Sequence, residues 1–584
     1  MGLYEEAARS YDNLKEKVGV YEGNKFPLAP ICHMVLPVEV EVTIDKDGKF
    51  ISAKELINEI VTEKKTTNKK GEVKVTTTTK TETKRIILPV TESSMGRTSG
   101  ISPHPLTEEL QYVSKSINTK KYDAYIELLS SFCCYTDNES VWAIYNYVSE
   151  HDLAIDILES NITVSDKTRI TWHVLGEDPI WNNTEVFDAW INYYTNNMKE
   201  NDNNDAALNN VIAGYGRLIS ANYAENFVGR FLDRDEACVN NFMLVQKAER
   251  FLRWVVANEG VSIGSRRYVC WNPNNGKSKD IRMPFANVDD CATFESYKDE
   301  LRKELFTLKN SKDALEKVIV VGFDSLTGYR TAVCYYSEFS KSDFYERLEK
   351  WDETCTYYDS FRKSISTVPL YKIVKYAYGT QQGDVFEMPD RCFAGRMQSL
   401  IHHRMTGAPI TKEIVQKLFD KSKALNTYKN NNRINITNIA SAMVNKYYID
   451  NKKGEFDMAN VEEKKMDRSY QFGRLLAIYE RIEKLATDQN DRDTTALKLE
   501  RRYCDRPLST AMMIETNIKR PYLSKLKEGQ KVYFEKLIGD TWNMIVECDG
   551  DNDRPLSESF IVGYHMQKNS FFRKKETTEM TEDK

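Results

Sequence analysis

The side chains whose chemistry stands out are basic, and one group of them lies in the first hundred residues. Residues 62–85 hold eight basic residues, three glutamates and nine threonines, for a net charge of +5. Threonine-rich stretches favour extended strands, and residues 68–71 suit the tip of a two-stranded ribbon. Lysines neutralise DNA phosphates, and such a ribbon fits the major groove of a duplex. A solvated loop of the same composition is the alternative to such a DNA-binding arm. The candidate contacts are Lys64, Lys65, Lys69, Lys70 and Lys74.

A second basic stretch, residues 498–531, also has a net charge of +5, with nine basic and four acidic residues. Tyr503 and Tyr522 are interleaved with the charges, and tyrosine rings stack on unpaired bases. This composition suits a groove for a single nucleic-acid strand, although the exposed face of a helical bundle has a similar one. The candidate residues are Arg501, Arg502, Arg506, Lys519, Arg520, Lys525 and Lys527.

A third candidate is the short segment Arg97-Thr98-Ser99-Gly100. Gly100 allows close approach of the backbone, the hydroxyls of Thr98 and Ser99 bond phosphates or base edges, and Arg97 supplies charge. A turn that merely packs against the protein is the alternative.

No motif indicates catalysis or metal binding. Asn275-Gly276-Lys277-Ser278 resembles the end of a phosphate-binding loop, but Trp271 stands where the first glycine belongs. His402 and His403 are adjacent on an expected helix, so their side chains point about 100° apart and do not share a metal. We therefore predict a protein that is not an enzyme and has no cofactor. The alternative is a metal-dependent nuclease or RNA-processing enzyme with dispersed carboxylates.

The overall composition restricts the partners and the compartment. The 584-residue chain has a formal net charge of −5, so affinity for nucleic acid must come from local patches. Its eleven cysteines form no CxxC pair, which indicates the reducing cytoplasm. The N-terminus lacks the apolar core of a signal peptide, and the longest apolar run, Val318 to Phe323, is too short to cross a bilayer.

Hydrophobic periodicity predicts an α+β multidomain fold. Val38 to Ile44 alternates with period two, as strands do, and a turn at residues 45–48 leads into Lys49 to Ser52, which predicts a β-hairpin. The pattern from residue 124 to about residue 220 is mostly helical, and short strands are expected at residues 267–271, 318–323 and 331–336. Beyond Met388, apolar residues spaced by three and four dominate, as in the stripe Phe534, Ile538, Thr541 and Ile545. We predict a β-rich N-terminal domain (1–123) with a basic β-ribbon arm (62–85), a mixed α and β middle region (124–387), a helical connector (388–457) and an all-α C-terminal bundle (458–584).

Several segments together resemble a known family. Tyr470 to Glu483, Tyr533 to Gly539 and Leu556 to Gln567 are similar to the C-terminal third of the large subunit of the type I-C CRISPR surveillance complex, Cascade (the Csd family). Arg97 to Pro103 resembles that family's N-terminal loop, and Phe393 to Pro409 its helix-Gly-Pro segment. The match departs from the family around residues 196–240, and the arm is longer and richer in threonine.

The resemblance implies a non-catalytic subunit of an RNA-guided antiviral complex. Such a subunit recognises the protospacer-adjacent motif (PAM) in duplex DNA, promotes duplex opening and R-loop formation, guides the displaced non-target strand and recruits a helicase-nuclease. Because the guide RNA reads the sequence, the protein needs contact with only a few base pairs. The implied partners are crRNA, target double-stranded DNA, and the backbone, crRNA 5′-end and small subunits of Cascade.

The C-terminal bundle resembles a Cascade small subunit, which the resemblance links to internal translation of the large-subunit gene. Residues Lys453 to Met458 can be encoded by a purine-rich ribosome-binding sequence shortly before an ATG codon. We therefore predict an internal start at Met458, with Met466 as the second choice.

Overall fold

The computed structural model describes residues 2–67, 73–95, 97, 100–160, 162–198, 211–212, 216–217, 242–274, 316–327, 330–487, 492–519, 521–548 and 551–572. The chain forms two compact units. Unit 1 comprises Met1–Ser262, Arg266–Ile281 and Lys317–Glu338, and unit 2 comprises Ile263–Ser265, Arg282–Glu316 and Phe339–Lys584.

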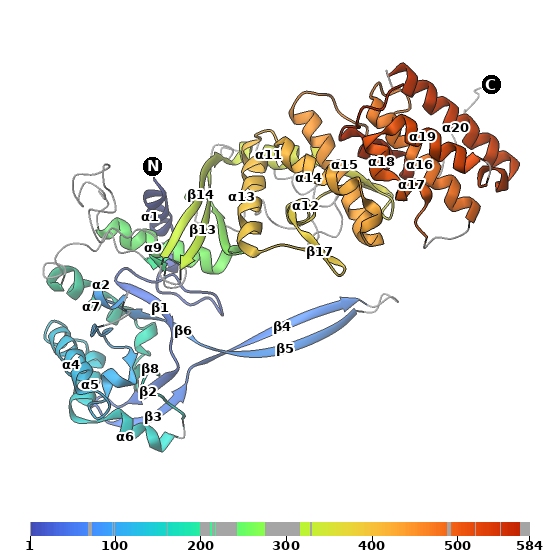
Figure 1. The fold of residues 1–584 in the computed structure, drawn as a ribbon. Helices are drawn as coiled ribbons and strands as arrows, with labels where there is room; N and C mark the ends of the chain where they lie inside the picture. Colours follow the sequence, from blue (N-terminus) through green and yellow to red (C-terminus); the bar gives the residue numbers. More distant parts are fainter. Residues whose placement is uncertain are drawn as a thin grey trace, which may run out of the picture. The chain divides into compact units, whose positions relative to one another are not determined.

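The first part of the chain, up to the end of β14, combines open sheets with helices (Figure 1). Its helices are α1 (Leu3–Asn13), α2 (Glu92–Met95), α3 (Leu110–Val113), α4 (Thr119–Cys133), α5 (Glu139–Glu150), α6 (Leu153–Asp156), α7 (Thr184–Tyr193) and α9 (Phe242–Glu259). Its strands are β1 (His33–Pro37), β2 (Val40–Ile44), β3 (Phe50–Glu55), β4 (Ile57–Thr67), β5 (Val73–Thr83), β6 (Arg85–Pro89), β7 (Glu108–Glu109), β8 (Arg169–Val174), β9 (Val211–Ile212), β10 (Gly216–Arg217), β11 (Val261–Ile263), β12 (Arg266–Trp271), β13 (Lys317–Thr327) and β14 (Arg330–Ser340).

The N-terminal core forms on a four-stranded sheet in the order β3-β2-β8-β7. The hairpin predicted from Val38 to Ser52 is present as the antiparallel pair β2–β3. The inward residues Val40, Val42 and Ile44 pack in one cluster with side chains of α4 and α5. The opposite face of β2 is covered as well, because Glu41 accepts a hydrogen bond from Trp181 Nε1 at 2.7 Å. The alternation of apolar and polar residues therefore predicted the strand correctly, while tertiary packing buried both of its faces.

Strand β8 lies inside a region that the sequence pattern predicted as mostly helical. It pairs in parallel with β2, from Val40 opposite Ile170 to Ile44 opposite Val174. A six-residue strand gives a weak periodic signal, and its partner lies more than a hundred residues earlier in the chain. Only the folded sheet therefore reveals it.

A second sheet has the strand order β11-β12-β13-β14-β10-β9. Helices α1 and α9 pack with Val269 and Trp271 of β12 and Val321 of β13 in one apolar cluster. The strands predicted at residues 267–271, 318–323 and 331–336 correspond to β12, β13 and β14.

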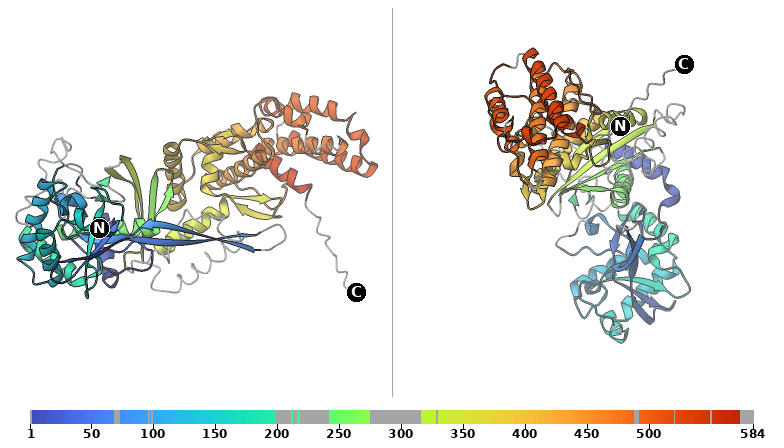
Figure 2. Two further views of the ribbon diagram at one scale, coloured as in Figure 1. Left: turned by 90° about the horizontal axis from the view of Figure 1, so that it is seen from below. Right: turned by 90° about the vertical axis from the view of Figure 1, so that its right-hand side faces the viewer.

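The basic stretch 62–85 forms part of a long antiparallel ribbon. Strands β4 and β5 pair from Ile57 opposite Thr83 to Thr67 opposite Val73. The view of Figure 1 and the left view of Figure 2 show this ribbon extending away from the four-stranded sheet. The predicted β-ribbon is thus present, while its predicted tip at residues 68–71 lies outside the described residues.

The rest of the chain, from α11 onward, is mainly helical with two small hairpins. Its helices are α11 (Lys341–Thr354), α12 (Leu370–Tyr378), α13 (Asp390–Thr406), α14 (Lys412–Ser422), α15 (Asn430–Asp450), α16 (Arg468–Thr487), α17 (Thr495–Lys498), α18 (Glu500–Asp505), α19 (Pro507–Lys519), α20 (Glu528–Glu547) and α21 (Ser559–Ser570). The hairpins are β15 (Thr356–Asp359) with β16 (Ser364–Thr367), and β17 (Thr380–Gln382) with β18 (Val385–Glu387). Among the described residues no strand follows β18, in agreement with the predicted loss of strand signals beyond Met388.

The C-terminal helices pack around α16. The stripe Phe534, Ile538, Thr541 and Ile545 is the buried face of α20, as its spacing by three and four predicted. Helix α16 is buried on nearly all sides because α19, α20 and α21 all contact it. None of the helices in the described part of the chain is long and apolar enough to cross a membrane.

Candidate nucleic-acid interface

The base of the β4–β5 arm is anchored in the core of unit 1. The backbone N–H of Lys84 donates to Leu56 O at 2.9 Å, and Leu56 is buried. Lys84 Nζ lies 3.7 Å from the centroid of the Trp181 ring, a cation–π contact. Tyr21 also stabilises the base of the arm, because its hydroxyl donates to Trp181 O at 3.1 Å and accepts from the N–H of Ile87 at 2.7 Å. The arm therefore begins from a fixed base.

The strand register distributes the predicted lysines along the arm. Position 64 is opposite Thr76, position 65 is opposite Val75, and position 74 is opposite Thr66. Since successive strand positions alternate between faces, positions 64 and 74 fall on one face of the ribbon and position 65 on the other. Lys69 and Lys70 lie outside the described residues.

The Arg97 loop is held by a buried ion pair. Arg97 Nη1 donates to Glu108 Oε2 at 2.7 Å and Nη2 donates to Glu108 Oε1 at 2.9 Å. Nη1 also donates to Ser102 O at 2.6 Å, and the guanidinium lies 4.7 Å from the centroid of the Tyr112 ring. Although burial opposes its charge, Glu108 has a lowered pKa because Arg97 hydrogen-bonds its carboxylate. Arg97 thus ties the two ends of the loop together.

Gly100 lies between these anchors and is exposed. Its φ of +91° is in the left-handed region that favours glycine, and an added Cβ would meet nothing within 4 Å. The backbone at Gly100 is therefore open to close approach by a ligand. Thr98 and Ser99 lie outside the described residues, and direct DNA contact by Arg97 stays a prediction.

The C-terminal basic residues fall into two groups. Arg501, Arg502 and Arg506 are exposed on α18 and at its end, and Lys525 and Lys527 are exposed just before α20. The side chain of Lys519 and the whole of Arg520 lie outside the described part of the chain.

The interpretation of Tyr503 as a stacking residue is wrong. Tyr503 is fully buried, and its hydroxyl donates to Phe472 O at 2.9 Å. The helical turn of α18 directs Tyr503 and Cys504 into the bundle while Arg501 and Arg502 face outward. Tyr522 is half-buried.

The two proposed start methionines have different surroundings. Met458 is 5% exposed and Met466 is 65% exposed, and both lie between α15 and α16. Use of either as an internal start stays a prediction, as do the domain boundaries at 123, 387 and 457.

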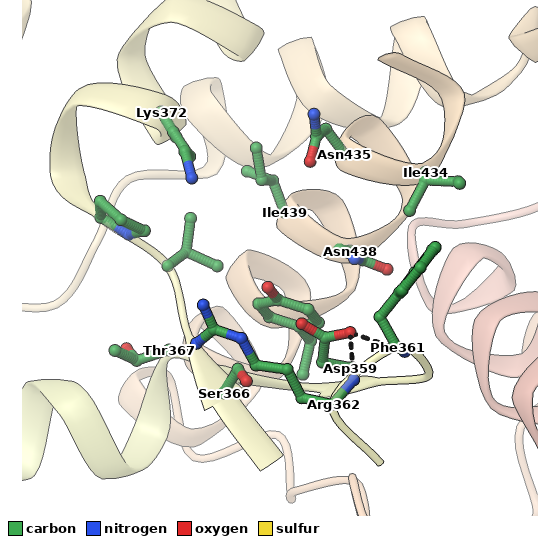
Figure 3. Close-up of a pocket in the computed structure, with 13 residues that line it drawn as sticks. Asp359, Phe361, Arg362, Ser366, Thr367, Lys372, Ile434, Asn435, Asn438 and Ile439 are labelled. Atoms are coloured by element: carbon green, nitrogen blue, oxygen red, sulfur yellow. Dashed lines mark hydrogen bonds between the residues drawn. The ribbon is translucent and has the colours of Figure 1, made fainter. Parts of the chain in front are cut away.

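A hollow that sequence reasoning missed lies between the β15–β16 hairpin and α15 (Figure 3). Its volume is about 280 Å³, and Arg362 and Lys372 line it together with Asn435 and Asn438. Phe361, at the hairpin turn, is 87% exposed. The sequence signal that could have indicated this hollow is the run Phe361-Arg362-Lys363, in which an aromatic residue precedes two cations between two short β-prone segments.

The histidine pair shows one exposed and one half-buried side chain. His402 is exposed, whereas His403 Nδ1 lies 3.1 Å from Ala408 O. Within the described ranges, no group of three or more His, Cys, Asp or Glu residues is placed to hold a metal ion. The Asn275–Ser278 segment lies outside those ranges.

The described residues thus include three separate basic elements: the β4–β5 ribbon, the loop that Arg97 holds through its ion pair, and the exposed arginines of the C-terminal helices. The sequence model of the CRISPR-associated protein family Cas_Csd1 matches residues 7–572. The chain belongs to the Cas_Csd1 family of CRISPR-associated proteins, and the resemblance to the type I-C large subunit is confirmed. No curated protein matches the chain.

Proposed function

We propose that this chain is a non-catalytic large subunit of a crRNA-guided type I-C Cascade complex that recognises the PAM in duplex DNA. In this role it also promotes duplex opening and R-loop formation, guides the displaced non-target strand and recruits the helicase-nuclease. Family membership supports a CRISPR-associated role, and the geometry of the arm supports the assignment of PAM recognition to it.

The observation that carries the proposal is the basic β4–β5 ribbon with its fixed base. A two-stranded ribbon fits the major groove, where the base edges are distinguishable. Positions 64 and 65 fall on opposite faces of the ribbon, and the excess of basic residues over residues 62–85 supplies charge for phosphate contacts. The Lys84–Trp181 contact and the buried Leu56 orient the ribbon before DNA arrives, which lowers the entropic cost of binding.

The Arg97–Glu108 pair supports a second contact near Gly100. Gly100 is exposed and has no side chain, which lets backbone N–H groups near it reach phosphates or minor-groove edges. Because Arg97 is bonded to both Glu108 and Ser102, it acts as a positioning residue for this loop.

The exposed arginines of α18 are suited to the displaced strand. Unpaired DNA is bound chiefly through phosphate contacts in a positively charged groove. Arg501 and Arg502 are exposed next to each other on a short helix whose other face is buried. They therefore act after the duplex has opened.

The test compares two double variants in the assembled complex. Lys69→Glu with Lys70→Glu is expected to weaken binding to PAM-containing duplex and to lower its salt dependence by roughly one unit of slope for each lost phosphate contact. Arg501→Glu with Arg502→Glu is expected to spare PAM-dependent binding and to reduce permanganate reactivity of the displaced strand. Lys412→Glu with Lys417→Glu, an equal charge change at exposed positions of α14, is the control.

Two results would contradict the proposal. An unchanged salt slope for the Lys69/Lys70 variant would show that the arm does not contact phosphates. Magnesium- or manganese-dependent cleavage of DNA or RNA that copurifies with the isolated chain would instead favour an enzyme.

A further inference from the structure

We propose that the hollow between the β15–β16 hairpin and α15 holds one unpaired nucleotide of single-stranded DNA, with its base stacked on Phe361. Assigning this nucleotide to the displaced strand rests on the proposed function. The residues that line the hollow lie outside the basic stretch at residues 498–531. Because Tyr503 of that stretch is buried and cannot stack on a base, Phe361 is the aromatic side chain proposed for stacking.

Phe361 supplies the stacking surface. It is 87% exposed, the highest value among the large hydrophobic side chains of the described residues. A phenyl ring that is not covered by the protein offers both faces to a ligand. Stacking on an aromatic ring accepts any base, because every base has a π-face.

The cations of the hollow are placed for the phosphate of the same nucleotide. Arg362 and Lys372 come from different elements, the hairpin turn and α12, and Figure 3 shows their nitrogen atoms directed toward the hollow. The acidic lining residue, Asp359, is occupied by the turn, since its Oδ1 accepts from the N–H groups of Phe361 at 2.9 Å and Arg362 at 3.2 Å. With two cations and one carboxylate in its lining, the hollow has a net positive charge.

The lining also contains polar groups suited to a base or sugar edge. Ser366 is 3% exposed, and its Oγ has no hydrogen-bond partner among the described residues. Asn435 and Asn438 of α15 contribute amides to the same hollow, and Asn435 Nδ2 is positioned by a 2.8 Å bond to the Tyr376 hydroxyl.

The hairpin is held in place before any ligand binds. Thr356 pairs with Thr367 and Asp359 with Ser364, and the Thr367 hydroxyl donates to Cys355 O at 3.0 Å. The volume of about 280 Å³ is just below the roughly 300–1,000 Å³ of typical small-ligand pockets. The size thus matches a single nucleotide better than a folded peptide segment.

The experiment measures binding of the full chain to a short oligothymidylate and to an abasic oligomer of the same length. Phe361→Ala is expected to weaken oligothymidylate binding roughly tenfold, because it removes one base–aromatic stacking contact. The same variant is expected to bind the abasic oligomer as the wild type does. Phe361→Tyr is expected to restore binding. Arg362→Glu is expected to weaken both oligomers and to lower the salt slope by about one unit. Phe572→Ala, which truncates another exposed aromatic residue, is the control.

Equal oligothymidylate binding by the wild type and Phe361→Ala would overturn the proposal. An equal loss of oligothymidylate and abasic binding in Phe361→Ala would also overturn it. A difference seen only with the RNA counterpart would overturn the assignment to DNA. Normal oligomer binding with failed capture of the helicase-nuclease would identify a protein-docking surface instead. A Phe361→Ala complex that still binds PAM duplex while losing oligothymidylate separates this inference from the proposed function.

Discussion

At the scale of single residues, two buried glutamates of the C-terminal helices are held in opposite charge states. Burial disfavours the charge of Glu480, but Lys568 and Lys484 lower its pKa to about 2. Lys484 Nζ lies 2.5 Å from Glu480 Oε1, and the Tyr564 hydroxyl donates to Oε2. Burial raises the pKa of Glu500 to about 8, although the backbone N–H of Leu425 donates to its Oε2 at 2.9 Å. One carboxyl is thus ionised and the other protonated near neutral pH.

The raised pKa of Glu500 predicts a loss of stability with rising pH. Between the unfolded pKa of 4.5 and the folded pKa of about 8, only the folded state keeps this proton. The stabilisation that the raised pKa of Glu500 gives to the folded state is therefore fully present below pH 4.5 and is lost as the pH rises through 8. Between these two values the free energy of unfolding falls by about 1.4 kcal/mol per pH unit. Glu500→Gln is expected to remove this slope in calorimetric unfolding. The exposed control Glu547→Gln should keep it, and an unchanged slope in Glu500→Gln would contradict the assignment.

At the scale of elements, the crossing of α16 and α21 depends on two glycines. A Cβ added at Gly473 would collide with the carbonyl oxygen of Phe560, and one added at Gly563 with the carbonyl oxygen of Tyr470. Both glycines lie in segments that carry the family resemblance. Their role explains why those segments occur together, since each helix supplies the backbone surface that the other packs against.

Gly473→Ala is expected to destabilise the C-terminal helices by about 1–3 kcal/mol, because backbone atoms on a neighbouring helix must move. Gly539→Ala in α20 is the matched control: nothing lies within 4 Å of its added Cβ, and alanine favours a helix by up to about 1 kcal/mol. Thermal unfolding of the two variants distinguishes them. Equal midpoints would show that the crossing tolerates a side chain.

At the scale of the whole molecule, the bundle predicted at 458–584 is continuous with the helices before it. Ser441 of α15 donates from its Oγ to Ile561 O at 3.3 Å, and His565 Nε2 lies 3.1 Å from Asn438 Oδ1. A product that starts at Met458 lacks α14 and α15, so the face of α21 that packs on α15 is uncovered. Such a product would need another protein surface over that face.

We expect mass spectrometry of the purified complex to find a species that begins at Met458. The buried face of α21 predicts that this species is recovered bound to other subunits and not free. Replacing the Met458 and Met466 codons by leucine codons that do not initiate should remove it. A small species that persists in this variant would show that the start lies elsewhere.

The sequence determined the features that depend on local periodicity and local charge. The alternation at Val40, Val42 and Ile44 predicted a strand, the stripe from Phe534 to Ile545 predicted the buried face of α20, and the bias of residues 62–85 predicted a basic ribbon. The segments that carry the resemblance also indicated the family from the sequence alone.

Only the tertiary structure decided which side chains are buried and which residues distant in the sequence contact each other. It paired Arg97 with Glu108, buried Tyr503, inserted β8 beside β2, and placed Phe361 and Arg362 beside the amides of α15. Each of these outcomes depends on groups that are far apart in sequence or on opposite sides of one short helix. Composition gives the charge of a segment, but burial and partners are set only when the chain packs.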